Sequence, residues 1–217
     1  MTPSKQVQQL VDFITAELPR ESWTPWPGGW PDQIEAALID AVLSISARYG
    51  SDTNGVRGAI GRYRTAVGSE SPDDLARLAN QDPETLQNIL NDQRISGRTK
   101  ATAIVEAANN LLNIGIKTAA DLNPQDPGQK KAYVSVHGLG WVTWEYLGML
   151  LGKPGIKADR WIVRFVSRAL GREVSATDAK SLLVDAAGAL SATPTDLDHA
   201  VWSYERSYEE PEGSEKA

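Results

Sequence analysis

A tight glycine turn between two helical segments constrains the fold of this 217-residue chain more than any other feature. The turn is Gly138-Leu139-Gly140, where glycine permits positive φ angles and a close approach of the backbone to a ligand. The segment after it carries apolar residues at helical spacing and ends at Gly152, with Pro154 just beyond. A helix therefore leaves the turn, and the backbone N–H groups of such a turn suit a phosphate.

A lone acid precedes the next helical segment. Asp159 is the only acid between Glu145 and Glu173, and the amphipathic segment that follows it closes at Gly171. One side of that segment carries arginines at i, i+4 and i+8, namely Arg160, Arg164 and Arg168. Residues 130–172 hold eight basic residues and two acids. The stripe is typical either of a solvated helix face or, beside the glycine turn, of a DNA-binding face.

These motifs resemble those of the helix-hairpin-helix DNA glycosylase superfamily, which has an endonuclease III-like fold. Residues 136–143 resemble its hairpin, and residues 153–160 resemble the Pro-x-x-Val-Asp-Thr element that carries its catalytic aspartate. Residues 41–46 resemble its Leu-Leu-Ser-x-Gln segment, and residues 97–101 its Gly-x-x-x-Lys-Ala helix start. The resemblance extends over roughly residues 34–190.

The resemblance and the absence of sustained alternation predict an all-α, two-lobed helical bundle with a helix-hairpin-helix motif. We expect helices over 4–18, from 32 to 50, over 55–67, within 95–113, over 176–190 and over 195–208. Residues 1–33, a helix and a Trp-rich loop, are expected to pack on the C-terminal lobe. The first lobe would be 34–125, the hairpin and C-terminal helices 126–208, and a disordered acidic tail 209–217.

The resemblance implies a monofunctional DNA glycosylase that hydrolyses the N-glycosidic bond of a flipped, damaged or modified base. Asp159 would stabilise the oxocarbenium-like state and orient or deprotonate a water. Relatives that also cut the strand carry a lysine where this chain has Val142, and valine cannot form a Schiff base. The alternative to a catalytic role is that Asp159 serves only as the N-cap of the helix that follows it.

Double-stranded DNA is the implied partner, bound by one copy of the chain. The hairpin residues expected to contact it are His137, Gly138, Leu139, Gly140, Val142 and Thr143. Phosphate contacts are expected from Arg98, Lys100, Lys157 and Arg160, with a solvated turn as the alternative reading for the first two. The carbonyls of Val136 and Gly138 are a candidate site for K⁺ or Na⁺, as in relatives.

Aromatic and polar residues near the motifs are candidates for a base pocket or for filling the DNA helix. They are Ser46, Arg48, Trp141, Trp144, Glu145, Trp161, His199 and Trp202. Ser46 stands where the superfamily has a glutamine that reaches into DNA, and serine is too short for that task. The loop of residues 23–31 holds three tryptophans, which either cap the core or stack on an unpaired base.

Composition excludes several classes of protein. The chain has no cysteine, which rules out disulfides and a four-cysteine iron–sulfur cluster, and its two histidines are far apart, against a tight zinc site. No leader and no long apolar run are present, so a cytoplasmic location without membrane insertion is expected. The net charge of −6 argues against a generic nucleic-acid binder. Together with the short Ser46 and the missing lysine at Val142, it favours the rival hypothesis of a non-catalytic DNA-binding protein that keeps the glycosylase fold.

Overall fold

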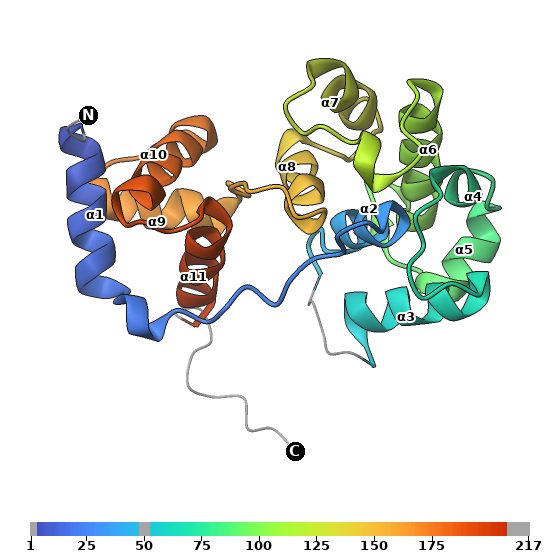
Figure 1. The fold of residues 1–217 in the computed structure, drawn as a ribbon, viewed down its shortest axis with the longest axis horizontal. Helices are drawn as coiled ribbons and strands as arrows, with labels where there is room; N and C mark the ends of the chain where they lie inside the picture. Colours follow the sequence, from blue (N-terminus) through green and yellow to red (C-terminus); the bar gives the residue numbers. More distant parts are fainter. Residues whose placement is uncertain (1–3, 48–52, 208–217) are drawn as a thin grey trace. The chain divides into compact units, whose positions relative to one another are not determined.

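The computed structural model describes residues 4–47 and 53–207 (Figure 1). This part of the chain contains eleven α-helices, two short 3-10 helices and one pair of two-residue strands. The predicted all-α class is therefore confirmed. By its internal packing the chain forms two compact units, residues 28–153 and residues 1–27 with 154–217.

Helix α2 (Ile34–Leu43) is the centre of the unit of residues 28–153. All ten of its residues are buried. It packs against α3 (Gly55–Val67), α6 (Lys100–Asn113) and α8 (Trp141–Leu150). A helix that is buried on every side needs neighbours on every side, so α2 sets the places of the others.

The remaining elements of this unit surround that core. They are α4 (Leu75–Ala79), α5 (Pro83–Leu90), β1 (Arg94–Ile95), β2 (Arg98–Thr99), η2 (Ala119–Asp121) and α7 (Pro127–Val134). The buried Glu35 joins three helices, because it accepts two hydrogen bonds from Arg77, one from the Tyr63 hydroxyl and one from Asp74 N. Each buried carboxylate oxygen is thereby satisfied.

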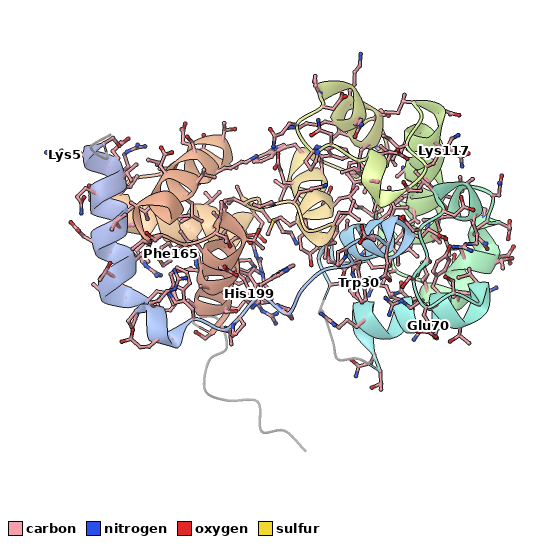
Figure 2. All side chains as sticks on the ribbon, in the orientation of Figure 1. Lys5, Trp30, Glu70, Lys117, Phe165 and His199 are labelled. Carbon is pink, nitrogen blue, oxygen red and sulfur yellow. The ribbon has the colours of Figure 1, made fainter. Side chains whose placement is uncertain are left out.

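Helix α9 (Arg160–Leu170) is the centre of the other unit. It packs against α1 (Lys5–Glu17), α10 (Ala176–Ala189) and α11 (Pro194–Ser207), and this unit also holds η1 (Arg20–Ser22). Its buried face consists of Ile162, Phe165, Val166 and Ala169. Phe165, labelled in Figure 2, meets the Phe13 ring edge-on with the ring centroids 5.3 Å apart.

The three tryptophans of the 23–31 loop differ in their burial and in their contacts. Trp30 is buried against α2, donates its Nε1–H to Asp40 Oδ2 at 2.7 Å and its backbone N–H to Leu150 O at 2.6 Å. Trp23 donates its Nε1–H to Leu18 O at 2.9 Å. Trp26 is half-buried beside His199. Trp30 therefore belongs to the hydrophobic core, which is the first of the two alternatives for the tryptophans of this loop.

Two boundaries differ from the expected ones. Helix α2 ends at Leu43 rather than at Gly50, because the chain turns at Ser46, which has a φ of 52°. The helices α7 and α8 group with residues 28–153 and not with the C-terminal helices, since α7 packs on α6 and α8 packs on α2. Gly50 and the acidic tail lie outside the described residues.

Candidate functional site

Asp159 is the N-cap residue of α9. Its Oδ1 accepts hydrogen bonds from Trp161 N at 2.9 Å and from Ile162 N at 3.5 Å. Within the described residues, Oδ2 accepts no hydrogen bond. One oxygen therefore fixes the carboxyl group on the helix terminus, and the other is available to a ligand.

Two opposing effects act on the charge of Asp159. Burial raises the pKa of this carboxyl above its usual value, while Lys157, the two N–H groups and Arg160 act in the opposite direction. The cap alone would lower the pKa, so desolvation outweighs it. A partly desolvated carboxylate interacts more strongly with a positive charge than one in water does.

A second carboxyl group, absent from the expected site, lies near Asp159. Asp198 on α11 is 5% exposed, and its Oδ1 accepts a hydrogen bond from Lys157 N at 2.8 Å. Burial, followed by the negative charge of Asp159, raises the pKa of Asp198 well above its usual value. The sequence does carry a signal for it: Asp198, Val201 and Glu205 stand at i, i+3 and i+7, which places two acids on the buried face of a helix.

Three rings from distant parts of the sequence stack together in the same unit. Trp26 meets the His199 ring edge-on at 5.3 Å between centroids, and His199 stacks on Trp202 at 5.7 Å (Figure 2 labels His199 on α11). All three are half-buried, and burial lowers the pKa of His199. The structure thus joins His199 and Trp202, both expected, with Trp26 of the Trp-rich loop.

The arginine stripe of α9 is largely occupied within the protein. Arg164 and Arg168 both bind the fully buried Glu205, the second at 2.7 Å. Trp161 is half-buried between two guanidinium groups, with Arg160 Cζ 4.3 Å and Arg164 Cζ 4.9 Å from its ring centroid. The stripe is therefore part of the packing of α9 on α11.

The glycine turn of residues 135–140 connects α7 to α8. Gly138 has a φ of 94°, and a Cβ there would lie 2.9 Å from Ile95 Cγ1 and from Ser96 Oγ. Only glycine fits at this place, because both the conformation and the space exclude a side chain. His137, Gly138 and Gly140 are exposed, whereas Val136 and Leu139 are buried. The Thr143 hydroxyl donates to Gly140 O at 2.8 Å, which ties the turn to the start of α8.

Arg98 contacts this turn from the β1–β2 pair. Its Nη2 donates to His137 O at 2.8 Å, and its Nη1 forms an ion pair with Glu106. The carbonyl of His137 and the carboxylate of Glu106 therefore compete with a DNA phosphate for Arg98. The candidate site for K⁺ or Na⁺ at the carbonyls of Val136 and Gly138 stays a prediction.

Lys100 does not fit the predicted phosphate contact. Its side chain is buried, and Nζ donates to Leu43 O at 2.8 Å, to Ile45 O at 2.6 Å and to Gln93 Oε1 at 2.8 Å. All three protons of the ammonium group are used, and burial lowers its pKa to about 8. Lys100 thus caps the C-terminal end of α2 from a neighbouring helix.

Two candidate base-pocket residues lie in the core of residues 28–153. Trp144 is fully buried and donates Nε1–H to Pro124 O at 3.0 Å. Glu145 is 7% exposed, on the same packed helix. Both side chains face the core, which contradicts their predicted place in a base pocket.

The other candidates of this unit lie at its surface. Trp141 is half-buried, with Lys130 Nζ 5.7 Å from its ring centroid, and Val142 is half-buried beside it. Ser46 is exposed just beyond α2. Arg48 lies outside the described residues.

A family model described as "Domain of unknown function (DUF8548)" matches residues 8–206. The chain belongs to this family. No curated protein matches the sequence.

Two solved structures share its fold. A 3-methyladenine DNA glycosylase of H. pylori, MagIII, bound to 1,N6-ethenoadenine, matches 96% of this chain and 100% of its own, with a TM-score of 0.67 and 15% identity. MBOgg1, in complex with a low-affinity DNA ligand, matches 81% of this chain with a TM-score of 0.58 and 17% identity. This chain covers 61% of the MBOgg1 chain. The fold is therefore that of the DNA glycosylases.

Two further features of the described residues bear on ligands and membranes. No helix among them is long and apolar enough to cross a bilayer. Nor do three or more His, Asp or Glu side chains gather there as a metal site.

Proposed function

We propose that this protein is a monofunctional DNA glycosylase of the helix-hairpin-helix superfamily. The observation that carries the proposal is Asp159, held at the start of α9 by two backbone N–H groups with Oδ2 left for a ligand. Breaking the bond between base and sugar creates positive charge at C1′, and a fixed, partly desolvated carboxylate stabilises that charge. Oδ2 would also orient or deprotonate the attacking water.

The absence of a lysine after the glycine turn supports hydrolysis over strand cleavage. Val142 stands at the position where bifunctional relatives form a Schiff base, and its side chain has no nucleophile. The product would therefore be an intact abasic site. The exposed turn of His137, Gly138 and Gly140 would bind a phosphate of double-stranded DNA with its backbone N–H groups.

The stacked rings of Trp26, His199 and Trp202 support a base pocket in the same unit as Asp159. An extruded base needs aromatic faces that replace the stacking it loses. Trp161, beside Asp159 in sequence, would form another wall. Because the fold of MagIII was solved with 1,N6-ethenoadenine, modified adenines are the first bases to test.

The decisive experiment compares the wild type with Asp159→Asn on duplexes that each carry one modified base, followed by alkali to cut abasic sites. The panel contains 3-methyladenine, 1,N6-ethenoadenine, uracil and oxidised bases. Asparagine caps helices as well as aspartate does, so this change removes the charge and keeps the cap. We expect a loss of excision of at least ~100-fold with unchanged stability.

A matched control is Asp82→Asn, which alters another helix N-cap, one whose carboxylate accepts from Thr85 N at 2.8 Å. Its excision rate should equal that of the wild type. Strand cleavage without alkali would contradict the monofunctional assignment. Excision that survives in Asp159→Asn would remove Asp159 from the chemistry.

The rival function is DNA binding without catalysis. The use of Asp159 Oδ1 as a helix cap favours it, because a capping aspartate needs no catalytic task. It predicts duplex binding that weakens with salt, no excision from any duplex of the panel, and equal binding by Asp159→Asn.

A further inference from the structure

A buried carboxyl group on α11 has no part in the function proposed above. Asp198 is 5% exposed, and its Oδ1 accepts a hydrogen bond from Lys157 N at 2.8 Å. Burying a carboxyl group costs free energy, and a carboxyl group buried near a candidate catalytic residue is itself a candidate for a functional role.

A continuous path of hydrogen bonds leads from Asp198 to the candidate catalytic carboxylate. Asp198 binds the N–H of Lys157, and the carbonyl of the same residue accepts from Asp159 N at 2.6 Å. Asp159 in turn binds Trp161 N and Ile162 N at the start of α9. Each link joins neighbouring atoms, so a displacement of Asp198 is passed on to Asp159.

A second contact from α11 fixes the same turn. Gly155 N donates to Thr195 Oγ1 at 3.2 Å, one turn before Asp198 on the helix. The segment of residues 155–159 is therefore held by α11 at two points. Asp198 is the contact nearer to Asp159 in sequence.

The charges around the two carboxyl groups distinguish their roles. Burial and the charge of Asp159 both raise the pKa of Asp198, and Lys157 opposes them. Arg160 of α9 favours the ionised form of Asp159. The other arginines of that helix, Arg164 and Arg168, bind Glu205, two turns farther along α11. Of two neighbouring carboxyl groups, the more deeply buried one holds its proton to a higher pH.

We propose that Asp198 is a positioning residue, which as a neutral carboxylic acid holds the turn of residues 155–159 and leaves the negative charge on Asp159. This inference rests on the proposed function of Asp159. A neutral Asp198 adds no negative charge beside Asp159, so it does not raise the pKa of the catalytic group by like-charge repulsion.

The test uses the full chain with Asp198→Asn, Asp198→Ala and the control Asp185→Asn, which changes an exposed acid on α10. Asparagine still accepts the hydrogen bond from Lys157 N and cannot ionise. We expect Asp198→Asn to keep kcat within ~3-fold and to leave the acid limb of the pH profile, which reports the ionisation of Asp159, at the wild-type pH. Asp198→Ala should lower kcat by ~10- to 100-fold with KM nearly unchanged.

A carboxyl-carbon NMR titration of the same proteins separates this inference from the proposed function. In the wild type Asp159 should ionise first and Asp198 at a higher pH, and Asp198→Asn should remove only the later step. Excision absent from the wild type would refute the glycosylase, while this titration would still decide the state of Asp198. An Asp198 that ionises before Asp159, or an acid limb that moves to lower pH in Asp198→Asn, would overturn the inference, because either result would mean that the wild-type Asp198 is negatively charged. Should Asp198→Ala fail to fold, the asparagine variant decides alone.

Discussion

Replacing Lys100 with methionine is expected to destabilise the unit of residues 28–153 and to leave DNA contacts unchanged. Lys100 Nζ donates to the carbonyls of Leu43 and Ile45 and to the side chain of Gln93. Methionine has a similar length but no donor, so two carbonyls at the end of α2 lose their partner. Gln93 is exposed and can turn to water.

The size of the effect follows from those two carbonyls. A buried acceptor that loses its partner costs about 1–3 kcal/mol. Burial of the ammonium group carries a desolvation penalty, which lowers the pKa of Lys100 to about 8. Methionine removes this penalty, and its removal offsets part of the cost of the two unpaired carbonyls. We therefore expect a net loss of about 2–4 kcal/mol, or a fall in Tm of about 5–15 °C for a chain of this size.

Thermal unfolding followed by circular dichroism measures the first effect, and the salt dependence of duplex binding measures the second. Lys117→Met is the matched control, because it makes the same change at an exposed lysine, labelled in Figure 2. Each phosphate contact contributes about 0.9 to the slope of log affinity against log salt. A Lys100→Met protein with native Tm and a slope reduced by about 0.9 would refute the capping role and restore the phosphate contact.

Four further substitutions test the packing and the charges. Gly29→Ala should lower stability by at least ~2 kcal/mol in urea unfolding, because the new Cβ would lie 2.2 Å from Leu150 O. Gly61→Ala, whose Cβ meets no atom within 4 Å, should instead raise stability by ~0.5–1 kcal/mol. Glu205→Gln should cost ~1–3 kcal/mol by the same assay, since it weakens the contacts of two arginines, and an unchanged midpoint would contradict the role of Glu205 in joining α9 to α11. The pKa of Asp198 is raised on folding, so its proton stabilises the fold below the unfolded value of 3.8, and this contribution is lost as pH rises. The Tm of Asp198→Asn relative to the wild type should therefore increase with pH, and a constant difference would show that Asp198 is ionised in the fold.

Most of the helices could be predicted from local signals. Periodic apolar residues, the aspartate before α9 and the glycine after it place that helix correctly at Arg160–Leu170. Asp82 and Pro83 do the same for the start of α5. Such signals act within a few residues of each other, so they can be recognised directly in the sequence. The end of α2 was predicted wrongly because its cap, Lys100, lies 57 residues away from Leu43 in sequence.

The site was predicted less completely for a related reason. Asp159 follows from its motif, whereas Asp198 lies 41 residues from its partner Lys157, and nothing near it in sequence indicates that contact. Trp144 and Glu145 stand beside the glycine turn in sequence, but they point into the core. Proximity in sequence to a motif therefore gives little information about which way a side chain faces.

The charge pattern shows the same difficulty most clearly. The local excess of positive charge over residues 130–172 predicted a DNA-binding face, yet two of its arginines pair with Glu205, which stands beyond that window. A buried carboxylate keeps its cations close, because in a medium of low dielectric constant separating the charges costs several kcal/mol. These arginines can therefore bind a DNA phosphate only if their ion pairs with Glu205 break. The exposed Lys131 and Lys153 lie nearer the glycine turn in sequence and within its own unit. Any salt-dependent affinity for DNA is therefore expected to fall more in Lys131→Ala and Lys153→Ala than in Arg168→Ala, and the opposite order would mean that the pair with Glu205 opens on binding.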